Sequence, residues 1–515
     1  MRCLIEIHIS EVPEGAKIIG SRYLFKVKQT SQGLVDKLKT RLIAQGYRQC
    51  EGIDYAVFEA FAPVVRYATL RIMLAVAAAY DLILWQMDVK TAYLNGDLPE
   101  GEEVYLRPPK GYKCKPGTIL KLKKGLYGLK TSGALWNKNL HKFLIRIGFK
   151  RTTCDACMYT RIHGDEYTIV CIYVDDITIA SNRQKYIDQL RKSFKQKYKM
   201  DDKGELEWIL GMRVTRNRHK RTIHLDQERY ILDSLKRFNM DDPLKEPPID
   251  TPADPNVTLS KAMCPKNSLE EKEMAKKPYA RLVGTLLYAV ISTRPDIANA
   301  VRQVSRYMAN PGKQHWKAAR RILRYLKGTP KLGITFSGNR NSIDISCYAD
   351  AAFAPCIDTR RSTTAFVVYW NNAPVTWESR TQPTVAKSTT ESEYMAMAEA
   401  TSELLWQLSV ARDLQIGVYG PITLFEDNQG AIALANTRKH MRRTKHIDIR
   451  YHFVREIREK GLVDFVFCET KEMIADALTK SLPRPAFRRL RAMLLGHAPK
   501  PAYERLTSSS KDEFH

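Results

Sequence analysis

The sequence has no long apolar run, and this absence argues against a membrane-spanning helix. The longest apolar stretches of the 515 residues, 70–84 and 282–291, are too short or too interrupted to cross a bilayer. No apolar segment near the N-terminus resembles a signal peptide. We therefore expect a cytoplasmic or nuclear protein that is not secreted.

Cysteine is sparse and scattered. The ten cysteines include one C-x-x-C pair, Cys154 and Cys157, without a second Cys or His pair at the spacing of a zinc site. This pattern indicates reduced, structural thiols rather than a disulfide framework or a zinc centre.

Acidic residues are few relative to basic ones. The chain has 56 Asp and Glu against 83 Lys and Arg, which gives a formal charge of +27. Such a field attracts polyanions, and nucleic acid is the natural candidate. A solvated basic surface or an anionic membrane partner is the alternative, and net charge alone does not separate them.

The length and composition indicate a multidomain globular protein. A chain of 515 residues exceeds what one hydrophobic core usually supports, so two to four domains are expected. Its hydrophobic content of 44% and charged content of 27% are ordinary for globular proteins, which excludes wholesale disorder.

Acidic residues follow strand-like segments in the N-terminal half. An apolar run ends at Asp88, and the β-rich segments 168–174 and 177–180 are separated only by Asp175 and Asp176. The second pattern predicts a hairpin with two carboxylates at its tip. Most Asp-Asp pairs are ordinary turns, but no Gly or Asn is present here to make one. If the strands pair side by side, the carboxylates could hold two Mg²⁺ ions roughly 3.5–4 Å apart, as phosphoryl transfer requires.

The rest of the chain divides at a Pro- and Asp-rich linker, residues 241–255. Residues 278–327 are strongly helical. Within them, the basic helix 316–327 either follows a nucleic-acid backbone or is a solvated face over a Leu/Ile stripe. From residue 342, alternating strands and helices indicate a self-contained α/β domain. The segment from residue 483 is basic, then polar, and we expect a loose tail.

An ordered series of short motifs runs along nearly the whole chain. The N-terminal half contains KTRLIAQG from Lys39, DVKTAYLNGDL from Asp88, LYGLK from Leu126 and YVDD from Tyr173. The C-terminal half contains TRPDI from Thr293, HW from His315, RRST from Arg360, KSTTESEY from Lys387, DN from Asp427 and ADALTK from Ala475. Together they resemble the reverse transcriptase and ribonuclease H portion of copia-type long-terminal-repeat retrotransposon Pol polyproteins.

For the N-terminal half, the resemblance implies an RNA-directed DNA polymerase with two metal ions, Mg²⁺ or Mn²⁺, in its active site. Asp88 and Asp175 would bridge the metals, and Asp176 would support the primer end. One metal would activate the primer 3′-hydroxyl and the other would hold the triphosphate.

The resemblance also implies a dNTP-binding set. Lys39 and Arg41, on a predicted basic hairpin over residues 22–45, would grip the triphosphate. Tyr93 would form the floor under the incoming sugar and exclude a 2′-hydroxyl, while Tyr127 and Gly128 would line the pocket. Without the family pattern, the two basic residues would be read as solvated edge-strand charges, and core packing would explain Tyr127 equally well.

The C-terminal half carries a second set of carboxylates, which resembles the four-carboxylate, two-metal site of ribonuclease H: Asp350, Glu393, Asp427 and Asp476. Such a site cuts RNA within an RNA/DNA hybrid. Glu393 is chosen over Glu391 because YMAM follows it, as in the family pattern. Asp427 could also cap a helix, which is compatible with metal binding. His446 and His452 are interpreted as structural.

The resemblance implies a multidomain α+β and α/β architecture, a right-hand polymerase followed by a ribonuclease H-like domain. We place the fingers and palm at residues 1–245, the helical thumb and connection at 246–340, the ribonuclease H-like domain at 341–482 and a basic, polar tail at 483–515. The expected partners are an RNA template, a DNA primer, an RNA/DNA hybrid and dNTPs. Integrase and particle-forming proteins of a complete element would join them in a cytoplasmic virus-like particle.

Three segments depart from the family pattern. Residues 54–62 are about two residues too long, residues 351–356 lack an acidic residue and a glycine, and residues 1–9 follow the pattern poorly. The particle-forming, protease and integrase regions are absent, so a fragment or degraded copy is expected. A catalytically inactive nucleic-acid-binding remnant is therefore the alternative function, and a genomic relic that is never made in quantity is a further one.

Overall fold

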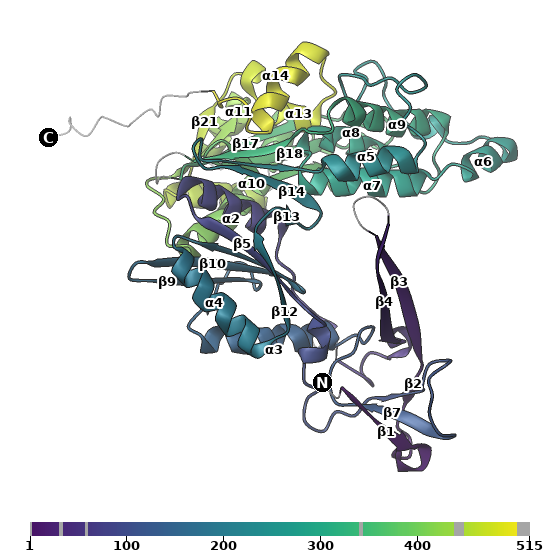
Figure 1. Cartoon of the computed structure of the whole chain (residues 1–515). Helices are drawn as coiled ribbons and strands as arrows, with labels where there is room; N and C mark the ends of the chain where they lie inside the picture. Colours follow the sequence, from purple (N-terminus) through teal and green to yellow (C-terminus); the bar gives the residue numbers. More distant parts are fainter. Residues whose placement is uncertain (1–2, 30–33, 57–59, 339–342, 437–447, 502–515) are drawn as a thin grey trace. The chain divides into compact units, whose positions relative to one another are not determined.

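The computed structural model describes residues 3–29, 34–56, 60–338, 343–436 and 448–501. The chain forms two compact units, whose elements are labelled in Figure 1. The first unit comprises residues 1–66 and 82–206, and the second comprises residues 67–81 and 207–515. Among the described residues, no helix is long and apolar enough to span a membrane.

The first unit is built around a six-stranded antiparallel sheet of order β12-β5-β11-β10-β9-β8. Its strands are β5 (Ile83–Val89), β8 (Lys150–Arg151), β9 (Met158–His163), β10 (Glu166–Tyr173), β11 (Asp176–Ser181) and β12 (Met200–Glu205). The central strands β10 and β11 are almost continuously buried, which explains their apolar sequences.

Two helices accompany this sheet, α3 (Ser132–Arg146) and α4 (Gln184–Lys197). The Phe143 ring lies 5.1 Å from the Phe194 ring and 5.3 Å from the Tyr198 ring, measured between centroids. These contacts join the two helices through aromatic burial.

A small sheet and a two-stranded ribbon complete the first unit. The sheet has the order β1-β7-β6-β2, with β1 (Leu4–His8), β2 (Ile18–Ile19), β6 (Tyr105–Leu106) and β7 (Thr118–Leu122). The ribbon pairs β3 (Ser21–Gln29) with β4 (Val35–Ala44), which confirms the predicted hairpin. Its register places Lys26 opposite Lys39 and Val27 opposite Leu38. Because neighbouring residues of a strand point to opposite faces, one face is basic and the other apolar.

The second unit contains a helical region and a four-stranded sheet. The sheet has the order β13-β14-β15-β16, with β13 (Trp208–Ile209), β14 (Met212–Asn217), β15 (Thr222–Asp226) and β16 (Gly333–Ser337). The helices are α2 (Tyr67–Ala79), α5 (Glu228–Arg237), α6 (Ser268–Ala275), α7 (Tyr279–Ser292), α8 (Ala298–Ser305) and α9 (Lys313–Gly328).

The basic helix α9 uses its charged side chains within the protein. Lys327 Nζ donates to the carbonyl oxygens of Met240, Asp242 and Glu246 at 2.7 to 3.1 Å, and Arg324 Nε donates to Pro247 O at 2.8 Å. These bonds hold the segment that the sequence predicted to be a linker. Lys327 and Arg324 therefore make intramolecular contacts. For these two residues, this differs from both a nucleic-acid contact and a solvated basic face.

A five-stranded mixed sheet forms the C-terminal part of the second unit. Its order is β19-β18-β17-β20-β21, with antiparallel pairs from β19 to β17 and parallel pairs from β17 to β21. The strands are β17 (Ile345–Ala352), β18 (Thr363–Trp370), β19 (Ala373–Thr381), β20 (Ile422–Glu426) and β21 (Val463–Phe467). The helices are α10 (Thr389–Asp413), α11 (Gln429–Asn436), α12 (Asp448–Glu459), α13 (Asp476–Thr479) and α14 (Arg484–Leu494).

Helix α14 differs from the loose tail expected from residue 483 onward. Its Phe487, Leu490 and Leu494 recur at helical spacing and are buried. Leu490 and Leu494 join an apolar cluster with Tyr348 of β17 and Phe425 of β20. The basic composition obscured this apolar stripe, so the expectation of a loose segment was wrong for residues 484–494.

Two candidate carboxylate sites

The first candidate site lies at the turn between β10 and β11, and we call Asp88, Asp175 and Asp176 the hairpin site. Tyr173 pairs with Asp176, which confirms the predicted hairpin, but the turn is formed by Val174 and Asp175 rather than by the two aspartates, because Asp176 is the first residue of β11. Val174 has a φ of 58°, a conformation that is costly for a β-branched residue. Its carbonyl accepts a hydrogen bond from Trp136 Nε1 at 2.6 Å, and Asp175 O accepts one from Val89 N at 2.9 Å. The turn is therefore held by the strand and helix beside it.

The sheet register brings the carboxylates of the hairpin site together. Asp176 on β11 is directly opposite Asp88 on β5. Lys203 of β12 places its Nζ 3.2 Å from Asp88 Oδ2 and 3.2 Å from Asp176 Oδ1. Burial, and then Asp88 and Asp176, raise the pKa of Asp175. Burial lowers the pKa of Lys203, but the two carboxylates raise it by more, so the pKa lies above its ordinary value. The hairpin site thus attracts cations.

Three residues of the predicted dNTP-binding set gather near Asp175. The rings of Tyr93 and Tyr127 meet edge to face with centroids 5.0 Å apart, and the Arg41 guanidinium lies 5.3 Å from the Tyr127 ring centre. Burial raises the pKa of both tyrosines, and the charge of Asp175 contributes in the same direction. Lys39 lies two residues before Arg41 on β4, on the same face of the ribbon.

Gly128 has a packing role beside this group. Its φ is 97°, and a Cβ at this position would lie 2.2 Å from Ala44 O. Tyr127 O also accepts a hydrogen bond from Ala44 N at 2.8 Å. Glycine therefore lets the Tyr127 turn approach the end of β4, and Gly128 acts through this close contact.

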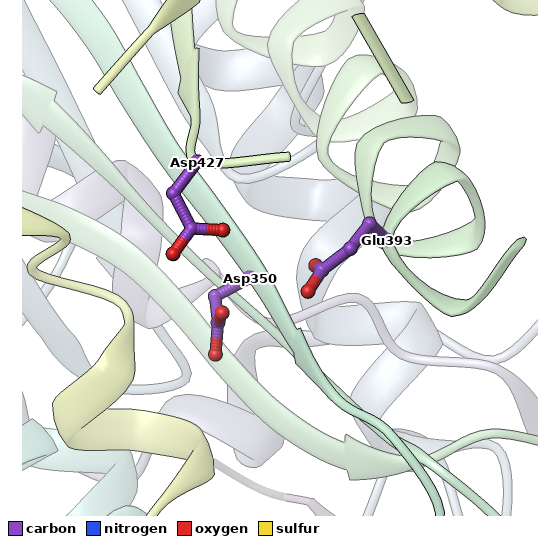
Figure 2. Close-up of side chains that lie close together, drawn as sticks. All are labelled: Asp350, Glu393 and Asp427. Atoms are coloured by element: carbon purple, nitrogen blue, oxygen red, sulfur yellow. The ribbon is translucent and has the colours of Figure 1, made fainter. Parts of the chain in front are cut away.

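The second candidate site lies on the five-stranded sheet, and we call Asp350, Glu393, Asp427 and Asp476 the C-terminal site. Figure 2 shows Asp350, Glu393 and Asp427 converging from β17, α10 and the residue after β20. Each offers one carboxylate oxygen, and these oxygens all lie within 4.8 Å of one another. Glu393 Oε2 is fixed by a hydrogen bond of 2.5 Å from Ala351 N.

Asp476 joins this group through a lysine. Lys480 Nζ lies 2.5 Å from Asp476 Oδ1 and 3.4 Å from Asp350 Oδ1. Thr479 Oγ1 donates a hydrogen bond to Asp350 Oδ2. Helix α13 and the residue that follows it therefore supply a carboxylate, a hydroxyl and an ammonium to the same place.

Burial dominates the electrostatics of the C-terminal site. It raises the pKa of Asp350, of Glu393 and of Asp476, and the neighbouring carboxylates raise the last two further. Burial lowers the pKa of Lys480, but Asp350 and Asp476 raise it further than burial lowers it. The resulting need for positive charge fits divalent cations, since all the converging donors are carboxylate oxygens.

The structure thus places Asp88 opposite Asp176 with Asp175 at the adjacent turn, and it brings Asp350, Glu393 and Asp427 within 4.8 Å of one another, with Asp476 linked to Asp350 by Lys480. Among the described residues, the three carboxylates of the hairpin site do not form such a close group. Two further charged residues, Lys203 and Lys480, contact the sites and were missed by sequence reasoning. Lys480 ends one of the motifs quoted above and so left a signal. Lys203 left none, because its contacts depend on strand pairing. His452 lies on α12, while His446 lies outside the described residues.

Comparison with known proteins decides the family. Residues 6–251 match the family model described as reverse transcriptase (RNA-dependent DNA polymerase). The chain is 38% identical over 480 residues to the retrovirus-related Pol polyprotein from transposon TNT 1-94 of Nicotiana tabacum, which covers 93% of the chain. It belongs to the copia-type Pol polyprotein family. A second Pol polyprotein, from transposon RE1 of Arabidopsis thaliana, is 36% identical over 479 residues and 92% of the chain.

The chain spans about a third of the length of these Pol polyproteins, 35% of the first and 31% of the second. A solved foamy viral protease-reverse transcriptase in complex with double-stranded DNA matches 91% of this chain and 67% of its own at 14% identity, with a TM-score of 0.23. A ribonuclease H1 in complex with an RNA/DNA hybrid matches 26% of this chain and 94% of its own at 13% identity, with a TM-score of 0.21. TM-scores this low do not indicate a shared fold or shared ligands.

Proposed function

We propose that this chain is an RNA-directed DNA polymerase with a C-terminal ribonuclease that degrades RNA in RNA/DNA hybrids. The observation that carries the proposal is the pairing of Asp88 with Asp176, next to Asp175 at the β10–β11 turn, in a chain of the reverse transcriptase family. A second, separate carboxylate group on the five-stranded sheet supports the nuclease. The right-hand arrangement of fingers, palm and thumb and the domain boundaries given above are part of the proposal.

The hairpin site would hold two Mg²⁺ or Mn²⁺ ions through Asp88 and Asp175. These ions would neutralise charge on the attacking and leaving oxygens during phosphoryl transfer. Asp176, which accepts a hydrogen bond from Gln86 Nε2 at 3.4 Å, would orient the primer end. The fixed turn at Val174 keeps the carboxylates in place without reorganisation during the reaction.

The residues near Asp175 would select and hold the incoming dNTP. Tyr93 would exclude a ribose 2′-hydroxyl, and Tyr127 and Gly128 would shape the pocket. Arg41 and Lys39 would grip the triphosphate. The ribbon supports this role because Lys26 and Lys39 are directly opposite each other, which concentrates positive charge on one face.

The C-terminal site would bind two divalent cations through Asp350, Glu393, Asp427 and Asp476. Lys480 and Thr479 would hold the carboxylates of Asp350 and Asp476 in position. Its substrate would be the hybrid that the polymerase makes, recognised by helix shape and 2′-hydroxyls rather than by base sequence.

Primer extension on an RNA template tests the proposal. The full chain with dNTPs and Mg²⁺ or Mn²⁺ should extend a DNA primer, and Asp175→Asn should not. Asp165→Asn, on the distant β9–β10 turn of the same unit, is the matched control and should extend like the parent. If the parent fails to extend but still binds the primer-template, the proposal is wrong, and an inactive nucleic-acid-binding remnant is the better description.

A further inference from the structure

The C-terminal site has a neighbour that none of its assigned residues explains, the carboxylate of Glu426. This residue ends β20 and directly precedes Asp427. Phe425 packs against Tyr348 in the apolar cluster that also contains α14. Successive side chains of a strand alternate between faces, so Glu426 faces the opposite side of the sheet, where α10 carries Glu393.

Glu426 is fully buried, yet its carboxylate is only partly satisfied. Its Oε1 accepts a hydrogen bond from Asn428 N at 3.2 Å. Its Oε2 has no hydrogen-bond partner among the described residues. Burying a carboxylate oxygen without a hydrogen-bond partner lowers the stability of the fold. The bond from Asn428 N, which precedes α11, uses only Oε1. Fold stability alone therefore does not explain an acid here.

Strand alternation puts the Glu426 carboxylate on the face that carries Glu393, and its charge acts on the carboxylates of the C-terminal site. Among the charges that act on Glu393, that of Glu426 is the largest and exceeds those of Asp350 and Asp427. Asp350 and Asp427 are in turn the charges that act on Glu426. Glu426 is thus part of the same electrostatic group, although it approaches from the α10 side.

The charge of the site is consistent with a fifth acid. Metal ligands bind in their deprotonated form, and five carboxylates together with Lys480 would then have four negative charges, which two divalent cations would neutralise. We propose that Glu426 is a fifth carboxylate of the C-terminal site, which strengthens its binding of divalent cations from the side of Glu393. This inference rests on the proposed function only in taking Asp350, Glu393 and Asp427 as metal ligands.

Mn²⁺ titration of the full chain tests this inference. The Asp175→Asn background weakens the hairpin site, so that the C-terminal site dominates the binding isotherm measured by calorimetry. In this background, Glu426→Gln keeps the shape of the side chain and removes its charge. We expect it to weaken Mn²⁺ binding by about tenfold, the lower end of the effect of residues that support metal ligands.

The matched control is Glu378→Gln. Glu378 lies on β19 of the same sheet, and burial raises its pKa too. This variant should bind Mn²⁺ like its parent. Without metal, Glu426→Gln should melt at the same temperature as its parent or higher, because an unsatisfied, repelled carboxylate has been removed. A purely structural glutamate would instead lower the melting temperature.

Unchanged or tighter Mn²⁺ binding in the folded Glu426→Gln protein would overturn the inference. So would an equal loss in Glu378→Gln, since the effect would then not belong to the site. If the Glu426→Gln protein does not fold, Glu426→Asp, which keeps the charge, must retain Mn²⁺ binding within about threefold of the parent, or the inference fails. Absence of hybrid cleavage by the parent would contradict the proposed nuclease while leaving the metal-binding result intact.

Discussion

The two carboxylate sites differ in depth and in how each balances its charge. In the hairpin site, the side chains of Asp88 and Asp176 are 28% and 29% exposed and share Lys203 across paired strands. In the C-terminal site, the side chain of Asp350 is fully buried, that of Asp476 is 8% exposed, and Lys480 binds both. Each site therefore contains a lysine, but only the deeper site buries most of its charge.

Because of this difference in burial, the carboxylates of the two sites are stabilised in different ways. An exposed carboxylate is stabilised by water, so the hairpin site depends mainly on backbone geometry at Val174 to aim its ligands. A buried carboxylate needs a counter-charge, so the C-terminal site depends on Lys480 and on bound cations. Substitutions should therefore act mainly on activity at the first site and on both activity and stability at the second.

The largest expected effect is the loss of one nuclease ligand. Glu393→Gln should reduce cleavage of RNA in a hybrid by at least about a hundredfold, because it removes a converging carboxylate. Primer extension should be unchanged. The matched control is Glu391→Gln, whose carboxylate accepts a hydrogen bond from Lys387 N at the helix start. If Glu391→Gln abolishes cleavage and Glu393→Gln does not, the choice between the two glutamates is wrong.

Removal of each lysine compares the sites directly. Without metal, Lys480→Met should lower the free energy of unfolding by about 2 kcal/mol, since it leaves the buried Asp350 without its cation. Lys203→Met should lower it by less than about 1 kcal/mol, because its partners are partly solvated. Urea denaturation in EDTA measures both, and Mg²⁺ should reduce the Lys480→Met loss. Equal losses would remove the distinction between a deep and a shallow site.

Tyr93 tests the selectivity expected of the hairpin site. Tyr93→Ala should raise incorporation of ribonucleotides relative to deoxyribonucleotides by about tenfold, because the ring that would meet a 2′-hydroxyl is gone. The ratio of kcat/KM values for rNTP and dNTP measures this. Tyr127→Phe keeps the ring beside Tyr93 and serves as the control. An unchanged ratio in Tyr93→Ala would place the sugar elsewhere.

The last prediction concerns pH and the support of the hairpin site. Asp202 of β12 accepts hydrogen bonds from Trp85 Nε1 at 2.7 Å, Lys195 Nζ at 2.7 Å and Arg191 Nη2 at 2.6 Å. Burial raises the pKa of Asp202, but these donors hold it well below its usual range. Its stabilisation is therefore fully present above the pKa of an unfolded aspartate, about 4, and is lost as the pH falls below it.

Asp202→Asn should accordingly be less stable than the parent by about 1 kcal/mol at pH 7. The difference should shrink as the pH is lowered from about 4 toward 2, since the parent loses the same interaction. Thermal melting across this range measures it. A difference that is constant with pH would show that Asp202 contributes through packing alone.

The sequence predicted the elements that carry the carboxylates better than the contacts around them. The apolar runs on both sides of Asp175 and Asp176 specified the hairpin, because such strands are buried, although the turn lies one residue earlier than predicted, at Val174 and Asp175. The pairing of β5 with β11, which puts Asp88 opposite Asp176, could be assumed but not predicted from the sequence. Pairing between strands that are distant in the sequence leaves no local signal.

Charged residues were the hardest to interpret. Lys203 and Lys480 gain their roles from tertiary contacts, and the direction of Glu426 depends on strand alternation within a sheet whose order the sequence does not show. The basic helix α9 could not be assigned either, because its partner is a distant segment of the same chain.

The most direct test of two separate sites uses a preformed hybrid with distinct labels on the DNA primer and the RNA template. Primer growth and RNA shortening are then followed in one reaction. We predict that Asp175→Asn cuts the RNA without extending the primer and that Asp350→Asn extends the primer without cutting the RNA. Loss of both activities in either folded variant would contradict the account, because it would mean that the two carboxylate groups do not work as independent sites.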